Sequence, residues 1–185
     1  LLSKTLISLE EGCVDLRKKS FVTIDGKTAK DFDDAVFSEK NKSGELVLYV
    51  AIADVGRFVK PQSAMDDEAI ERGTSVYFTQ KVIPMLPEII SNNLCSLRPN
   101  EDRYCLVCKT NISKEGDPQE VEFFEAIINS KARLTYEKVA DQMKTKNFSE
   151  PYTQSLKNLV EIYKILKKAK KTRGALELDI PFYVP

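Results

Sequence analysis

The stretch VTIDGKTAKDFDDAVF, residues 22–37, places four aspartates between two short apolar runs. Asp25, Asp31, Asp33 and Asp34 fall within ten residues. If both flanking runs are strands, these acids lie at two strand ends and in the loop between them. Carboxylates packed so closely repel one another, so either some take up protons or a cation neutralises them. The stretch predicts either a solvated acidic turn, since loops are rich in aspartate, or a cation site.

Oxygen-rich ligand sets suit Mg²⁺, with Mn²⁺ as an alternative ion. When such an ion is shared with a phosphate, it offsets the phosphate charge and lowers the pKa of the attacking water. This is how many enzymes cleave phosphodiesters. A phosphatase with an aspartyl nucleophile would instead need its DxD motif directly after an apolar strand, whereas the polar residues 27–30 precede Asp31. A phosphatase of small molecules therefore lacks a fitting motif.

The bulk composition describes an ordinary globular chain. It has 185 residues, 42% of them hydrophobic, and 28 basic residues balance 28 acidic ones. This neutral charge neither indicates nor excludes a nucleic-acid partner. No run of 18 apolar residues predicts a membrane span, and residues 1–13 lack a signal-peptide pattern. The pair Cys105 and Cys108 has no second pair and the chain has no histidine, so buried cytoplasmic thiols are expected and not zinc.

The first half of the chain mixes strands with short helical signals. Residues 46–54 are almost continuously apolar, which predicts a strand buried on both faces. A short helix is expected between Ser63, the candidate N-cap, and Gly73, the residue after its end. A strand is expected over residues 74–78. The proline-broken segment 84–99 predicts an irregular connection with one helical turn.

The second half predicts a long hairpin followed by helices. Apolar runs at 103–113 and 120–134 flank a turn segment and favour antiparallel pairing. Thr135 is the candidate cap of a helix that runs to about Met143. Strands followed by helices indicate an α+β fold. We expect a mixed, mainly antiparallel sheet or a partial barrel with flanking helices.

A second helix is expected over residues 153–172, with Gly174 just after its end. Its predicted apolar face consists of Leu156, Leu159, Val160, Tyr163 and Leu166. The basic residues of segment 164–174 complement the helix dipole at the C-terminal end and are expected to be solvated, with RNA contact as the alternative. Residues 176–185 form an apolar, uncapped end, so we expect the chain to be a fragment of a longer protein.

Five motifs follow one another along the chain: VTIDGKTAKDFDDAVF, YVAIADVGRFVKP, DDEAIERGTSVYF, VIPMLPEIISNNLCSLRPNEDRYCLVC and FFEAIINSKARLTYEKV. Together they resemble the RNB domain of the ribonuclease II and ribonuclease R family, and the bacterial ribonuclease R branch in particular. The resemblance covers roughly residues 14–174. It implies an RNB-like fold in which residues 1–20 are a lead-in segment and residues 21–185 are the N-terminal portion of the catalytic domain.

The resemblance implies a processive 3′-to-5′ exoribonuclease that hydrolyses single-stranded RNA from its 3′ end, releases nucleoside 5′-monophosphates and uses Mg²⁺. Asp25, Asp31, Asp33 and Asp34 match the four active-site aspartates of the family. Asp33 matches the one essential for cleavage, and the other three match those that hold the metal and position the substrate. Tyr77 matches a tyrosine that stacks on a terminal base, although from its strand context alone it would be a core aromatic.

The chain also departs from the full family pattern. An RNB domain is longer than this chain, and its later segment contributes a glutamate and an arginine near the scissile phosphate. The cold-shock and S1 domains expected in the parent protein are also absent from the sequence. We therefore expect an incomplete domain that is inactive by itself. The alternative is a noncatalytic RNA-binding relative, which the intact set of four aspartates disfavours.

Overall fold

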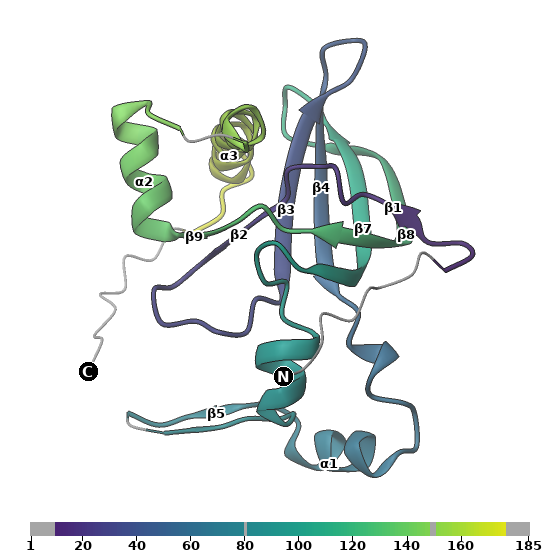
Figure 1. Cartoon of the computed structure of the whole chain (residues 1–185). Coiled ribbons are helices and arrows are strands. Elements are labelled where there is room, and N and C mark those ends of the chain that lie inside the picture. Colours follow the sequence, from purple (N-terminus) through teal and green to yellow (C-terminus); the bar gives the residue numbers. More distant parts are fainter. Residues whose placement is uncertain (1–9, 80, 149–150, 177–185) are drawn as a thin grey trace.

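Runs of β-branched and aromatic residues form a seven-stranded mixed sheet in the computed structural model, which describes residues 10–79, 81–148 and 151–176 (Figure 1). The strand order is β1-β8-β7-β4-β3-β2-β9. The strands are β1 (Val14–Asp15), β2 (Val22–Asp25), β3 (Asp34–Lys40), β4 (Leu46–Ala53), β7 (Asp102–Ile112), β8 (Pro118–Asn129) and β9 (Ala132–Thr135). The pairs β1–β8 and β2–β9 are parallel, and the other neighbours are antiparallel.

The sheet curls strongly. Only Ser130 and Lys131 separate β8 from β9, yet β9 lies at the opposite end of the strand order, beside β2. The backbone N–H of Lys131 donates to the carbonyl of Phe21 at 2.7 Å, which extends the pairing of β9 with β2 by one residue. The ladder does not close into a full barrel within the described residues. The predicted α+β fold with a mixed, mainly antiparallel sheet is confirmed. Strand β1 lies within the segment predicted as a lead-in and joins the sheet through β8.

Three aromatic rings pack together in the hydrophobic core of the sheet. Phe21, Phe37 and Tyr49 are buried, and the ring centroids of Phe21 and Phe37, and of Phe37 and Tyr49, lie 5.5 Å apart. The ammonium group of Lys19 lies 5.3 Å from the Phe37 centroid and also pairs with Glu39. Tilted aromatic pairs at this spacing stabilise a core beyond the area they bury. This core fixes the β2–β3 corner of the sheet.

The helices begin where their caps predict. In α1 (Ala64–Arg72), the Ser63 side chain accepts a hydrogen bond from the backbone N–H of Asp66, and Gly73 ends the helix with a φ of 69°. In α2 (Tyr136–Thr145), Thr135 accepts from the N–H of Lys138. A side-chain oxygen at the N-cap satisfies an N–H that has no partner inside the helix. These predictions, and the predicted bounds of α3 (Thr153–Thr172), are confirmed.

Helix α3 packs on β3 through polar side chains, so its predicted apolar face is wrong in part. The Ser38 N–H donates to Ser155 Oγ at 3.0 Å, and Asn158 Nδ2 donates to the Ser38 carbonyl at 3.3 Å. Strand β2 pairs with β3 only around Val36, so the backbone N–H and carbonyl of Ser38 that point toward β2 find no partner in the sheet. Side chains of α3 supply these hydrogen bonds instead. The residues buried along α3 are Ser155, Leu156, Asn158, Ile162 and Ala169.

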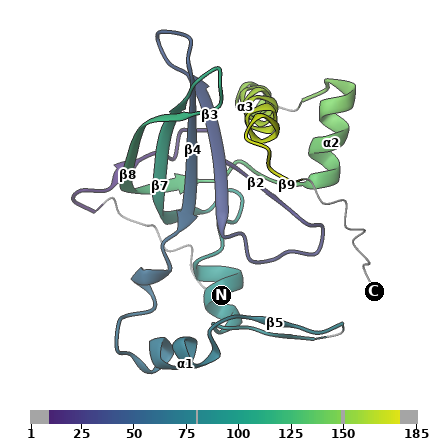
Figure 2. The same ribbon diagram turned by 180° about the vertical axis from the view of Figure 1, so that it is seen from behind.

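The remaining elements lie at one end of the sheet (Figure 2). They are the one-turn helix η1 (Val55–Arg57), the hairpin of β5 (Val76–Tyr77) and β6 (Val82–Ile83), and the short helix η2 (Ile90–Leu94). The strand expected over 74–78 is shorter than predicted, and η2 is the helical turn predicted within 84–99. Among the helices that the structure describes, none is long and apolar enough to cross a membrane. Residues 177–185 of the apolar end lie outside the described residues.

Candidate functional site

The four aspartates lie at the junction of β2 and β3. Strand β2 ends at Asp25, β3 begins at Asp34, and residues 26–33 form the loop between them (Figure 1). The two strands are antiparallel, with Val22 opposite Val36. The last residue of β2 and the first residue of β3 therefore lie at the same end of the sheet. We call residues 25–34 the acidic loop.

Ser96 holds the backbone of the acidic loop. Its Oγ accepts a hydrogen bond from the Phe32 N–H and donates one to the Lys30 carbonyl, both at 3.0 Å. The Leu97 N–H donates to the Phe32 carbonyl at 2.9 Å. Phe32, Ser96 and Leu97 are all buried. The loop is therefore anchored from the core side by a segment far away in the sequence.

Arg133 on β9 anchors the other end of the acidic loop. Its Nη2 donates to the carbonyls of Gly26 and Lys27, both at 2.7 Å. The guanidinium carbon lies 5.7 Å from the centroid of the Phe32 ring. Its Nε is buried, with no hydrogen-bond partner among the described residues. Arg133 thus binds two backbone carbonyls of the loop through one nitrogen and places a positive charge beside the acids.

The carboxylates form one coupled set of charges. Burial is the main cause that raises the pKa of Asp25, followed by the charge of Asp34, while Arg133 acts in the opposite direction. One oxygen of Asp25, Oδ2, is buried and has no hydrogen-bond partner among the described residues. The pKa of Asp33 is also raised, first by partial burial and then by the charges of Asp31 and Asp34. A cation bound between these carboxylates would relieve this repulsion.

The four side chains do not form a ready-made metal cage. Across the described ranges of the chain, no three His, Cys, Asp or Glu side chains come close enough to hold a metal ion. The carboxylates of the acidic loop are close enough to shift one another's pKa values. They are too far apart to coordinate the same ion in this arrangement. The donor chemistry fits Mg²⁺ or Mn²⁺, because all four groups offer hard carboxylate oxygens and one of these is an unpartnered buried atom.

A second acidic group, Asp54, lies beside the acidic loop and is already paired. The Ala53 N–H donates to the Asp33 carbonyl at 2.9 Å, which sets the end of β4 against the loop. Asp54 Oδ2 accepts from Arg57 Nε at 2.7 Å. Arg57 also pairs with Glu10 and Glu125. Asp54 therefore belongs to a separate ion-pair network.

The nearby thiols stay protonated at neutral pH. Burial, followed by the charges of Asp54 and Asp33, raises the pKa of Cys95 to about 11. Burial likewise raises the pKa of Cys105 to about 12. The structure describes all four cysteines as free. No thiolate is therefore available to this site as a nucleophile or as a soft metal ligand.

Tyr77 is exposed on the β5–β6 hairpin, so the interpretation of this residue as a core aromatic is wrong. It retains 70% of its accessible surface, and its neighbour Phe78 retains 59%. In both views the hairpin projects from the same flank of the molecule as the acidic loop (Figures 1 and 2). The stacking role of Tyr77 stays a prediction.

Sequence reasoning missed both anchors of the acidic loop. Ser96 belongs to a segment predicted to be irregular, and it meets the loop across a sequence separation of 64 residues from Phe32. Arg133 lies 107 residues from Gly26. It falls within the motif FFEAIINSKARLTYEKV, but the sequence predicted no contact between it and the acidic loop. Only the pairing of β2 with β9, which sets Thr23 opposite Arg133, brings this arginine to the loop.

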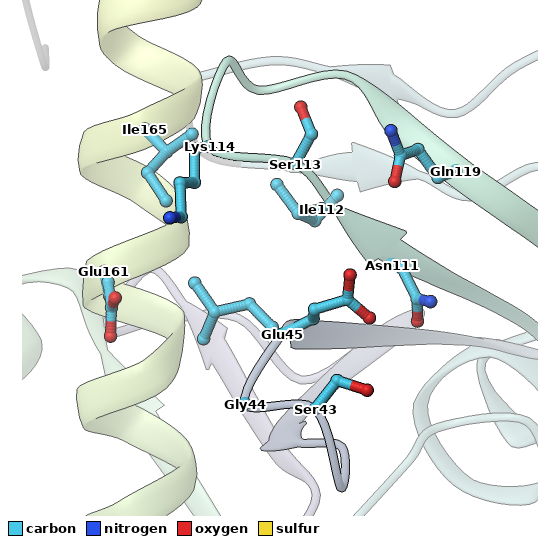
Figure 3. A pocket seen from close by; sticks show the side chains of 11 residues that line it. Ser43, Gly44, Glu45, Asn111, Ile112, Ser113, Lys114, Gln119, Glu161 and Ile165 are labelled. Carbon is cyan, nitrogen blue, oxygen red and sulfur yellow. The ribbon is translucent and has the colours of Figure 1, made fainter.

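A cavity of about 570 Å³ lies at the far end of β3. Figure 3 shows Glu45 of the β3–β4 turn and Asn111 near the end of β7 on one side of it, and Ile165 of α3 on the other. Asp34 begins β3 and this turn follows its last residue, so the length of a seven-residue strand, roughly 20 Å, separates the cavity from the acidic loop. The cavity does not belong to the acidic site.

The curled sheet and its acidic loop match one domain family. A family model described as "RNB domain" matches residues 13–183. The chain therefore belongs to the RNB domain family, and the resemblance given by its motifs is confirmed.

The chain is similar to ribonucleases R of several bacteria. The chain is 51% identical over 173 residues to ribonuclease R of Vibrio parahaemolyticus, a match that covers 91% of this chain and 21% of the relative. It is 48% identical to ribonuclease R of Escherichia coli, with the same coverage of both chains. Mycoplasma genitalium RNase R, solved in complex with double-stranded RNA, superposes with a TM-score of 0.84 at 34% identity. This match covers 93% of the present chain and 32% of that one. The chain thus spans about a fifth of the length of the curated relatives it matches.

Proposed function

We propose that this chain carries the acidic half of the active site of a 3′-to-5′ exoribonuclease that hydrolyses RNA processively to nucleoside 5′-monophosphates. The observation that carries this proposal is the acidic loop. It holds four carboxylates that influence one another, two at the ends of paired strands and two in the loop between them, in a member of the RNB family. Asp33 is the residue on which cleavage depends. Asp25, Asp31 and Asp34 are the proposed metal ligands.

Magnesium, or manganese in its place, is the proposed cofactor. When bound it would offset the charge of the scissile phosphate and lower the pKa of the attacking water. The unpartnered Oδ2 of Asp25 and the raised pKa values of Asp25 and Asp33 support a cation at this position. Arg133 and Ser96 fix the backbone on which these carboxylates stand.

The proposed partner is the 3′ end of single-stranded RNA. Tyr77 supplies an exposed ring, and stacking on a ring grips any base without sequence choice. Cold-shock and S1 domains of the parent protein are the proposed modules that would hold the upstream RNA. The free thiols fit a reducing compartment, which supports a cytoplasmic location.

The alternative is a noncatalytic RNA-binding member of the family. The absence of a preassembled carboxylate cage among the described residues favours this alternative. The retention of all four aspartates favours the enzyme, because RNA binding alone does not require a cluster that repels phosphate.

The test is a digest of 5′-labelled single-stranded RNA by the intact protein that carries this sequence, with Mg²⁺, with Mn²⁺ and with a chelator. The exonuclease should yield a short end product and release 5′-monophosphates only when metal is present. Internal fragments, or monophosphates that form equally well in the chelator, would contradict the proposal. Binding without any products in either metal would assign the chain to the noncatalytic alternative.

A further inference from the structure

One exposed face of α3 joins an aromatic ring to three cations. The residues follow a three- and four-residue spacing and so lie on one side of the helix. They line a hollow of about 480 Å³. We call them the Tyr163 stripe, and they are Tyr163, Leu166, Lys167, Lys170 and Arg173.

The Tyr163 stripe is not required for packing. Residues of α3 such as Ser155, Asn158 and Ile162 make its buried face, which leaves Tyr163 with 52% of its surface exposed and Leu166 with 37%. This explains why apolar residues predicted for the core remain at the surface. A ring and a leucine left exposed beside cations form an amphipathic surface suited to a ligand.

The positive charge of the stripe is uncompensated. Within the described part of the chain, Lys167, Lys170 and Arg173 have no acidic partner, and the acid on the same helix, Glu161, pairs with Lys40. The ammonium group of Lys167 lies 6.0 Å from the ring centroid of Tyr163. The helix dipole would be complemented by cations in the last turn alone, whereas Lys167 and Tyr163 lie further back. The stripe is therefore more than a solvated helix end.

We propose that the Tyr163 stripe binds the backbone of single-stranded RNA, with one base stacked on Tyr163. This inference rests on the proposed function, because it adds a contact to the same substrate away from the acidic loop. Lysine and arginine neutralise phosphates, and an exposed ring stacks on any base. An acidic protein segment would pair with the cations, but its carboxylates would not stack on the Tyr163 ring.

The helix provides a charge-matched control surface. Lys164, Lys168 and Lys171 lie on the adjacent outward side of α3 and are exposed. Lys167→Gln, Lys170→Gln and Arg173→Gln together remove three charges from the stripe, and Lys164→Gln, Lys168→Gln and Lys171→Gln remove three from the control side. Glutamine keeps a high helix propensity. Tyr163→Leu removes the ring and keeps an apolar side chain.

The measurement is the salt dependence of binding of a fluorescein-labelled 20-nucleotide oligouridylate, in a chelator so that no cleavage occurs. Each lost phosphate contact on a single strand reduces the slope of log K against log salt by about 0.7, so the stripe variant should lose about 2. The control variant should lose less than 1. Tyr163→Leu should weaken binding about 10-fold and leave the slope unchanged. Circular dichroism should show the same helix content in all three variants.

Equal slopes of log K against log salt for the stripe and control variants would overturn the inference. They would show that RNA is attracted to the basic helix as a whole and not to the Tyr163 stripe. Tighter binding of a 20-residue polyglutamate than of the RNA would also overturn it, in favour of an acidic protein partner. As a second measurement, 4-thiouridine RNA is crosslinked to the intact protein in the chelator and the modified peptide is identified. A crosslink within residues 163–173 supports the inference, and its absence overturns it. Neither result depends on cleavage, so the proposed function can fail independently.

Discussion

Arg133→Gln should loosen the acidic loop, and Arg133→Lys should loosen it while keeping the charge. Arg133 donates two hydrogen bonds of 2.7 Å to the carbonyls of Gly26 and Lys27. A hydrogen bond to a charged group contributes about 1.5–3 kcal/mol, and the arginine is only half-buried, so the two together contribute about 3 kcal/mol. Because 1.36 kcal/mol corresponds to tenfold in rate, turnover should fall about 10²-fold in either variant. Both bonds come from the terminal nitrogen Nη2. The lysine side chain is one bond shorter, so its ammonium should not reach both carbonyls from the position of Arg133.

The two variants should differ in their dependence on pH. Arg133 opposes the upward shift in the pKa of Asp25, so its neutralisation raises that pKa further. A carboxyl group with a raised folded-state pKa stabilises the fold when protonated, and this stability is lost as pH rises through the folded pKa. Arg133→Gln should therefore lose more stability than the wild type as pH rises above about 4. Measured by urea denaturation in a chelator, the pH dependence of stability should shift in Arg133→Gln and stay at that of the wild type in Arg133→Lys.

The assay combines hydrogen exchange with kinetics of the intact protein. Amides of residues 26–33 should exchange faster in both variants, while those of β4 and β7 should not change. If loop exchange and turnover both remain at wild-type values, the anchoring role assigned to Arg133 is refuted. A fall in turnover with unchanged exchange would show that the arginine acts directly on the substrate and not through the loop.

Three further predictions concern other parts of the site. Ser96→Ala removes one donor and one acceptor from the buried backbone of the acidic loop and should lower the free energy of unfolding by about 1–3 kcal/mol, measured by urea denaturation against Ser91→Ala as the control. Tyr77→Ala should change the length of the final undigested RNA while cleavage persists, since the lost stack contributes about 1–3 kcal/mol; an unchanged end product would make Tyr77 structural. The 185-residue chain alone should bind Mg²⁺ weakly and be close to inactive, and degradation near the rate of the intact protein would contradict this.

Local signals in the sequence predicted the elements, because caps and turns depend on a few neighbouring residues. Ser63 and Thr135 cap their helices through contacts three residues away, so a pattern of side chains is sufficient to place them. The acidic loop was placed for the same reason, since it lies between two short apolar runs. The exoribonuclease activity proposed for this loop came from the family resemblance and not from the spacing of its residues.

What the sequence could not predict depends on contacts between distant segments. Helix α3 buries polar side chains because the backbone N–H and carbonyl of Ser38 on β3 have no partner strand there and bond to the helix instead. The spacing of apolar residues along the helix carries no information about this need. The anchoring of the acidic loop by Ser96 and Arg133 follows from strand pairing and from packing of the segment after η2. The exposure of Tyr77 follows from the position of its hairpin outside the main sheet, where two-residue strands bury little.

The most direct test of the account is a comparison of Asp33→Asn with the wild type in the intact protein, under single-turnover conditions with saturating Mg²⁺. The substitution keeps the shape of the side chain and removes one charge from the coupled set. Cleavage should slow on the order of 10³-fold or more, about 4 kcal/mol of transition-state stabilisation, while the affinity for single-stranded RNA changes little. Near-normal cleavage by this variant would contradict the assignment of the acidic loop as the catalytic site.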